Sequence, residues 1–175
     1  ALPIYDREGV IMWPTEKELR AFYGNPDTNG DGSPDVAWES ANIVGIKPAY
    51  AMVLAWDTAG PVSKIRCHRL VAPSLKEILG EIGELGMDFI KKHELDHFGG
   101  AYNFRAKRGS PSLSVHSYGA AIDLSPAKNA WKKRWDPKTM MPLEVVEIFE
   151  AHGWVFGGTW STADAMHFQA TGVSK

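Results

Sequence analysis

The sequence predicts an α+β domain in which helices pack on a small, mainly antiparallel sheet. Segments with helical apolar spacing and short segments with strand-like alternation are mixed along the 175 residues, without a regular order. Runs rich in glycine and proline separate many of these segments. The α+β class is therefore the best fit to the pattern.

Three segments carry helix signals. A capping box at residues 15–18 predicts a short first helix that ends near Gly24. Apolar residues recur at helical spacing over residues 73–85, and residues 89–97 continue or restart this helix. A third helix is expected over residues 142–153, between an opening proline and a closing glycine.

Several short segments carry strand signals. Residues 51–56 and 62–67 are expected to be strands joined by a turn at residues 57–61. A turn at residues 117–119 should lead into a strand at residues 120–124, because glycine permits the turn and aliphatic residues then share one face. Further short strands are predicted at residues 101–105, 154–156 and 165–168.

Composition limits the classes of function. A net charge of −2 with scattered basic residues argues against nucleic-acid binding, and no apolar run is long enough to span a membrane. The lone cysteine, Cys67, forms no internal disulfide, and the N-terminus has no export signal, so we expect folding in a cytoplasm. We expect one domain over residues 1–175, with residues 1–50 as a helix and loop segment packed on it.

His116, Asp123 and His167 form a candidate zinc site. A catalytic zinc takes three protein ligands and leaves a fourth position for water. Asp164 precedes His167 by three residues and is the candidate general base. A single histidine on a strand is more often structural, but three residues in one pattern favour a metal site.

A rival zinc motif lies at residues 93–97, which read H-E-x-x-H. It would place His93 and His97 one helical turn apart, with the glutamate between them as the base. The third ligand of the longer motif would fall on Asn103, which is not an ordinary zinc ligand. We therefore favour the interpretation of this segment as a charged helix end.

A second candidate metal site lies in the loop at residues 27–35. Its acidic and amide residues follow the spacing of a calcium loop, with Gly32 at the sixth position, but Trp38 occupies the twelfth. A turn cluster without metal is the favoured alternative. The candidate calcium ligands are Asp27, Asn29, Asp31 and Asp35.

Two sequence motifs resemble those of the M15 zinc peptidases. Residues 114–123 read S-x-H-x-x-G-x-A-x-D, and residues 164–167 read D-x-x-H. The similarity extends to residues 99–105 (GGAYNFR) and to residues 154–160. This family includes D-Ala-D-Ala carboxypeptidases, VanX-type and VanY-type enzymes, and phage L-alanyl-D-glutamate endolysins. The sequences of residues 99–109 and 114–124 are most similar to those of the endolysin branch.

The resemblance implies a hedgehog/DD-peptidase-like zinc peptidase fold. It implies His116, Asp123 and His167 as Zn²⁺ ligands and Asp164 as the base, where many relatives carry glutamate. It further implies that Arg105 stabilises the oxyanion and that Arg105 and Ser114 bind substrate, although Arg105 read without the family would be a surface ion-pair residue. Asp164 departs from the pattern of those relatives, because the side chain of aspartate is one methylene shorter than that of glutamate.

The implied function is hydrolysis of an amide bond in peptidoglycan stem peptides. Resemblance to the endolysin branch implies that this bond is L-Ala-D-Glu. A monomer acting on the bacterial cell wall is expected, made in the host cytoplasm and released through a holin if the source is a phage. A D,D- or L,D-carboxypeptidase is the first alternative. A non-catalytic wall-binding or tail-associated module is the second, and the presence of the ligands, base and arginine argues against it.

Overall fold

The main sheet is mixed and mainly antiparallel, in a computed structural model that describes residues 4, 5, 9 and 11–172. Its six strands lie in the order β5-β4-β7-β8-β10-β9, and only the β4-β7 pair is parallel. This arrangement confirms the predicted α+β class. The strands are β4 (Val53–Leu54), β5 (Asp57–Pro61), β7 (His97–Gly100), β8 (Ala121–Leu124), β9 (Val155–Phe156) and β10 (His167–Gln169).

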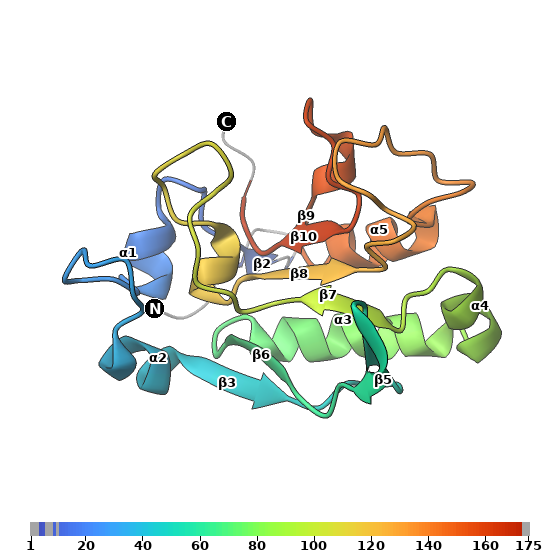
Figure 1. Cartoon of the computed structure of the whole chain (residues 1–175), viewed down its shortest axis with the longest axis horizontal. Helices are drawn as coiled ribbons and strands as arrows, with labels where there is room; N and C mark the ends of the chain where they lie inside the picture. Colours follow the sequence, from blue (N-terminus) through green and yellow to red (C-terminus); the bar gives the residue numbers. More distant parts are fainter. Residues whose placement is uncertain (1–3, 6–8, 10, 173–175) are drawn as a thin grey trace.

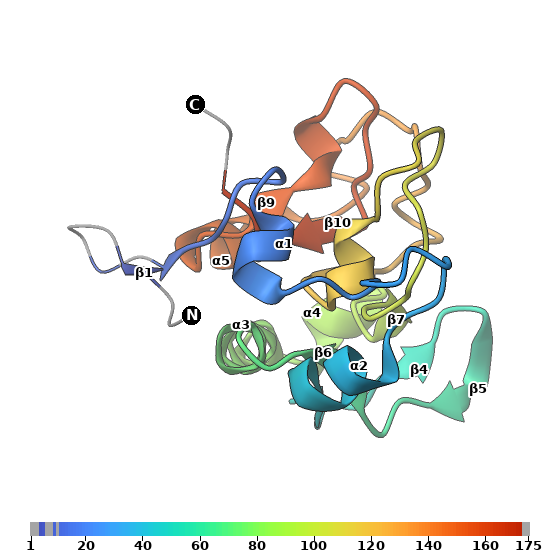
Figure 2. The ribbon, with the colours of Figure 1, turned by 90° about the vertical axis from the view of Figure 1, so that its left-hand side faces the viewer.

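Two helices, α3 (Ala72–Glu84) and α5 (Leu143–Ala151), pack against each other and form the main helical layer (Figure 1 and Figure 2). Both were predicted from apolar spacing. In α5, the Phe149 ring stacks on Phe168 of β10 with 3.8 Å between ring centroids. Both rings are fully buried, so α5 fixes the position of the strand that carries His167.

The N-terminal part of the chain contributes to the same hydrophobic core. Trp13, Leu19 and Tyr23 are buried in it, and the Tyr23 hydroxyl donates to the carbonyl of Ala170 over 2.8 Å. The elements outside the main sheet are β1 (Ile4–Tyr5), β2 (Ile11–Met12), α1 (Leu19–Tyr23), α2 (Val36–Asn42), β3 (Ile43–Ile46), β6 (Ile65–His68) and α4 (Met87–Lys92). Strands β1 and β2 form one two-stranded sheet, and β3 and β6 form another.

One turn prediction and two strand predictions differ from the structure. The predicted turn at residues 57–61 is strand β5, which tolerates Pro61 because it is the edge of the sheet. The predicted strand at 62–67 is shifted to β6 and pairs with β3, outside the main sheet. Residues 101–105 form no strand; the strand of this region is β7 at residues 97–100, because the helix before it ends at Lys92.

The strand after Gly119 was predicted to within a residue, and the turn before it begins two residues earlier than predicted. A 3-10 turn, η1 (Val115–Tyr118), ends at Gly119, and β8 begins two residues later. Gly119 has φ +67, and a Cβ there would lie 2.7 Å from the backbone nitrogen of His68 and 2.8 Å from Cδ1 of Ile43. Only glycine suits both this conformation and this close approach. The residue therefore sets the path between His116 and Asp123.

We predict that Gly119→Ala lowers the free energy of unfolding by about 2–4 kcal/mol, through left-handed strain and overpacking. The matched control is Gly80→Ala in α3, where a new Cβ would meet no atom within 4 Å. That change should raise the free energy of unfolding by about 0.5–1 kcal/mol. Urea unfolding measures both. Equal stability of the two variants would contradict the role given to Gly119.

Candidate metal centre

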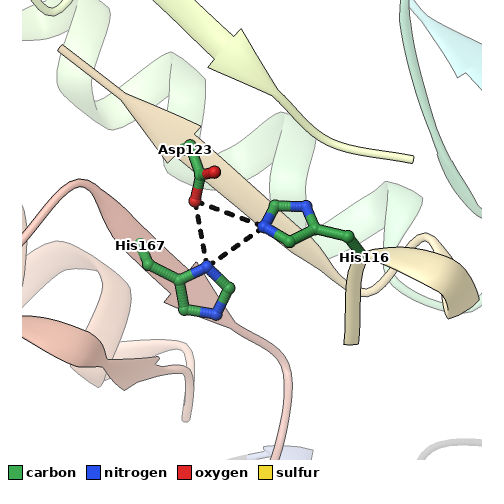
Figure 3. A group of neighbouring side chains, drawn as sticks. All are labelled: His116, Asp123 and His167. Atoms are coloured by element: carbon green, nitrogen blue, oxygen red, sulfur yellow. Dashed lines mark hydrogen bonds and ion pairs between the residues drawn. The ribbon is translucent and has the colours of Figure 1, made fainter. Parts of the chain in front are cut away.

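The side chains of His116, Asp123 and His167 converge on one point (Figure 3). Asp123 on β8 lies directly opposite His167 on β10 in the antiparallel register, and His116 comes from η1. The Nδ1 atom of His167 lies 2.9 Å from Oδ1 of Asp123. The Nε2 atom of His116 lies 3.1 Å from that nitrogen and 3.3 Å from that oxygen. The structure thus brings the three predicted ligands together.

Hydrogen bonds on the outer side of each ring orient the two histidines. Nδ1 of His116 faces the carbonyl of Ala101 at 2.6 Å, and a carbonyl only accepts, so this nitrogen carries the proton. Nε2 of His167 lies 2.9 Å from Oε1 of Gln169 and donates to it in the same way. In the neutral rings, the inward nitrogens are therefore both unprotonated. Two nitrogen lone pairs and a carboxylate oxygen face one another, an arrangement that suits a cation.

The geometry fits zinc. A tetrahedral zinc with ligand bonds of about 2.0–2.1 Å separates its ligand atoms by roughly 3.3 Å. The three observed separations are 2.9, 3.1 and 3.3 Å. Within the described residues, no other set of three His, Cys, Asp or Glu side chains converges in this way.

Burial and charge in this group act in opposite directions on the acid. Burial opposes ionisation of Asp123, but the hydrogen bonds and positive charges that His116 and His167 supply when both rings are protonated outweigh it, so its pKa lies well below the ordinary value. Burial disfavours the charged form of His167, but its hydrogen bonds to Asp123 and Gln169, together with the negative charges of Asp123 and Asp164, outweigh burial and raise its pKa. The carboxylate is thus ionised and available as a ligand at neutral pH.

Asp164 lines the same cleft as the three candidate ligands. Burial raises the pKa of its carboxyl, and the nearby charge of Asp123 adds to this effect. Its Oδ1 atom is buried and has no hydrogen-bond partner among the described residues. Its backbone nitrogen donates to the carbonyl of Gly157 over 2.9 Å, which holds the residue before β10. An unpartnered carboxylate oxygen with a raised pKa is suited to accept a proton.

Arg105 and Ser114 also line this cleft, as their predicted roles require. The backbone of Arg105 is anchored by Ser117, whose hydroxyl accepts from its nitrogen and donates to its carbonyl. Its side chain has no ion-pair partner among residues 11–172. The Ser114 hydroxyl accepts from the backbone nitrogen of His116 over 3.3 Å, so it caps η1. The contacts of both residues with substrate remain predictions.

The rival motif lacks the geometry that H-E-x-x-H chemistry needs. Helix α4 ends at Lys92, Glu94 has φ +53, and His97 begins β7. The two histidines are therefore not on successive turns of one helix. This agrees with the interpretation of the segment as a helix end.

The loop at residues 27–35 uses its carboxylates as turn acceptors. Asp27 accepts from the nitrogens of Asp31 and Gly32, and Asp31 accepts from that of Ser33. Asp35 accepts from the nitrogen and hydroxyl of Thr28. These bonds fit the turn-cluster interpretation. Calcium binding by Asp27, Asn29, Asp31 and Asp35 remains a prediction.

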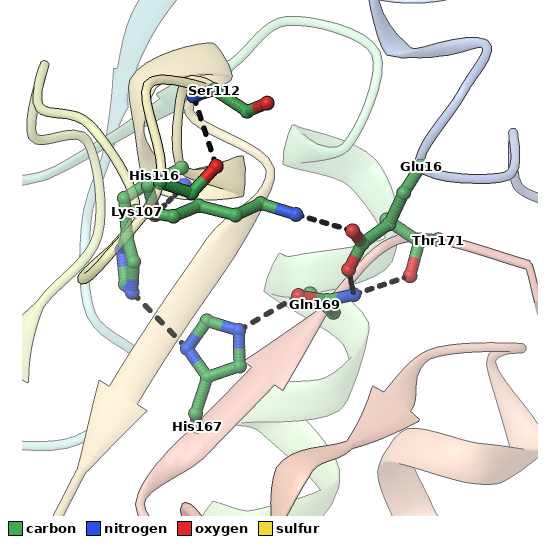
Figure 4. A network of polar contacts seen from close by, with 9 residues as sticks. Glu16, Lys107, Ser112, His116, His167, Gln169 and Thr171 are labelled. Carbon is green, nitrogen blue, oxygen red and sulfur yellow. Dashed lines mark hydrogen bonds and ion pairs between the residues drawn. The ribbon is translucent and has the colours of Figure 1, made fainter.

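A polar network behind His167 was not predicted (Figure 4). The side-chain nitrogen of Gln169 donates to Thr171 over 2.7 Å and to Glu16 over 3.2 Å, which turns its oxygen toward His167. Glu16 also pairs with Lys107, and although burial opposes its ionisation, these donors lower its pKa. The strand periodicity could have indicated Gln169, two residues after His167 on the same face. Nothing in the sequence indicates Glu16.

We predict that Gln169→Leu weakens zinc binding about 10- to 100-fold, because it removes the acceptor that sets the His167 tautomer. Thr171→Val is the control, since it removes a partner of Gln169 but leaves the bond to His167. Competition with a chromophoric chelator measures the affinity, and circular dichroism checks the fold. Unchanged affinity in Gln169→Leu would contradict the positioning role.

Comparison with known proteins agrees with this geometry. Residues 108–170 match the model of the family described as D-alanyl-D-alanine carboxypeptidase (Peptidase_M15_4). The match spans all three candidate ligands and Asp164, while Arg105 lies outside it. No curated protein and no solved structure matched the chain. Residues 108–170 are therefore similar to a domain of this carboxypeptidase family, and they contain His116, Asp123 and His167, the candidate zinc ligands.

Proposed function

We propose that this protein is a zinc-dependent peptidase that hydrolyses an amide bond in peptidoglycan stem peptides. The observation that carries the proposal is the convergence of two imidazole lone pairs and one carboxylate oxygen, beside the buried, unpartnered Oδ1 atom of Asp164 in an open cleft. The family match supports the substrate class. Peptide hydrolysis needs both an activated water and a proton acceptor, and this set of residues provides for both.

Zinc held by His116, Asp123 and His167 would acidify a water molecule and polarise the substrate carbonyl. Asp164 takes the proton from the attacking water and delivers it to the leaving amine. The raised pKa of Asp164 favours this proton transfer, because it lies closer to neutral pH than the pKa of an exposed aspartate. Arg105 donates to the oxygen on which negative charge develops.

Within this class we propose the endolysin type of reaction, cleavage at L-Ala-D-Glu. This proposal is supported by the sequences of residues 99–109 and 114–124, which are most similar to those of that branch. A protein of this type acts on the bacterial cell wall, as a monomer. If its source is a phage, it reaches the wall by release through a holin. No helix among the described residues is long and apolar enough to cross a membrane.

Carboxypeptidase activity, of D,D- or L,D-type, is the second candidate. The observation that favours it is the printed description of the matching family. The two activities leave different products. A carboxypeptidase releases one terminal amino acid, whereas an endopeptidase at L-Ala-D-Glu exposes a new amine on D-glutamate.

We predict that purified peptidoglycan digested by the zinc-loaded protein yields new amines on D-glutamate, and that a chelator abolishes the reaction. Mass spectrometry of the products identifies the bond. Release of single alanines would replace the endolysin assignment with the carboxypeptidase. Cleavage that persists without metal, or no cleavage of any amide, would contradict the proposed function.

Asp164→Asn should lower kcat about 10²- to 10⁴-fold while leaving zinc content unchanged, since it removes the proton acceptor and no ligand. Asp88→Asn makes the same chemical change at an exposed position of α4 and should leave kcat unchanged. Full activity of Asp164→Asn would assign the base to another group.

A further inference from the structure

The cleft above the metal centre continues into a second hollow. The cleft has a volume of about 550 Å³ and the second hollow about 630 Å³. Lys132, Trp160 and Thr162 line both of them. Trp160 also lies beside the metal centre, with its ring centroid 5.5 Å from that of His167. A substrate that enters the cleft can therefore extend past Trp160 without leaving the protein surface.

Cations surround this junction. Arg108 lines the cleft, Lys132 lines both spaces, and Arg134 lines the second hollow, which has no acidic residue in its described lining. Arg108 and Lys132 both lie against Trp131, with Cζ and Nζ each 4.3 Å from the ring centroid. Neither has a carboxylate partner among the described residues. Cation–π contacts hold both cations while their N–H donors stay available for a ligand.

Lys107, which also lines the cleft, provides a contrast. Its ammonium is paired with Glu16, so its charge is already compensated within the protein. The charges of Arg108, Lys132 and Arg134 are not compensated in this way by the part of the chain that the structure describes. An anionic group of the substrate is the natural partner for such a set.

The backbone of Lys132 gives independent support. Its φ is +68, a conformation that costs a lysine about 1 kcal/mol or more and that glycine or asparagine adopts more readily. Its nitrogen donates to the carbonyl of Ala163 over 2.8 Å, next to Asp164. The strained position therefore fixes the lysine to the segment that carries the candidate base. Strain of this kind is typical of functional sites.

We propose that Arg108, Lys132 and Arg134 form a subsite for a free carboxylate of the substrate peptide, away from the amide that is cut. This proposal rests on the proposed peptidase function and deepens it. The substrate class is a peptide that carries a free carboxylate and is long enough to reach from the metal centre past Trp160.

Two synthetic stem peptides of one sequence test the subsite, one with free carboxylates and one with these groups amidated. With the zinc-loaded protein, the KM of the amidated peptide should be about fivefold higher, with similar kcat, because partly exposed ion pairs contribute modestly. Lys132→Asn should remove most of this difference and keep its melting temperature, since asparagine tolerates the left-handed conformation. Lys133→Gln, which lines neither space, should keep the difference.

Equal KM values for the two peptides in the unmodified protein would overturn the subsite, as would an unchanged difference in Lys132→Asn. If neither peptide is cut, the peptidase function fails, and binding then decides the subsite separately. Tryptophan fluorescence of the metal-free protein measures that binding, because Trp131 and Trp160 line the cleft. Tighter binding of the free acid would support the subsite, and equal binding would contradict it.

Discussion

The antiparallel register that places His167 opposite Asp123 is the constraint on which the rest of the site depends. A shift of one residue would turn His167 to the other face of β10 and leave Asp123 without its partner. The stack of Phe168 on Phe149 opposes such a shift, because the shift would pull the ring of Phe168 out of the core. Hydrophobic packing on one face of the strand therefore fixes polar chemistry on the other.

The third ligand depends on local geometry. His116 reaches the other two because η1 ends in the left-handed Gly119, which lets the chain turn into β8 within a few residues. The same principle holds behind the site, where the carbonyl of Ala101 and the side chain of Gln169 determine which ring nitrogens face inward. Without those outer bonds the rings could present protons to each other instead of lone pairs. The groups that hydrogen-bond to the two histidines thus contribute to the preorganisation of the site as much as the ligands themselves.

What could be predicted from the sequence was mostly local. Apolar spacing was enough for α3 and α5, and the glycine turn into β8 follows from a few adjacent residues. The ligand set could be predicted from the sequence, because only a few residue types bind zinc. What failed depended on distant pairing: residues 57–61 look like a turn until the edge position of β5 is known. Glu16 reaches the site through a contact with Gln169 that spans 153 positions in the chain, which no local pattern reports.

We propose that His116, Asp123 and His167 bind one zinc ion. Anomalous diffraction at the zinc edge, from crystals grown with zinc, locates that ion. We expect a single peak about 2.0–2.2 Å from Nε2 of His116, Nδ1 of His167 and Oδ1 of Asp123, with a water as the fourth ligand. A peak at His93 and His97, or no peak among the three predicted ligands, would contradict it.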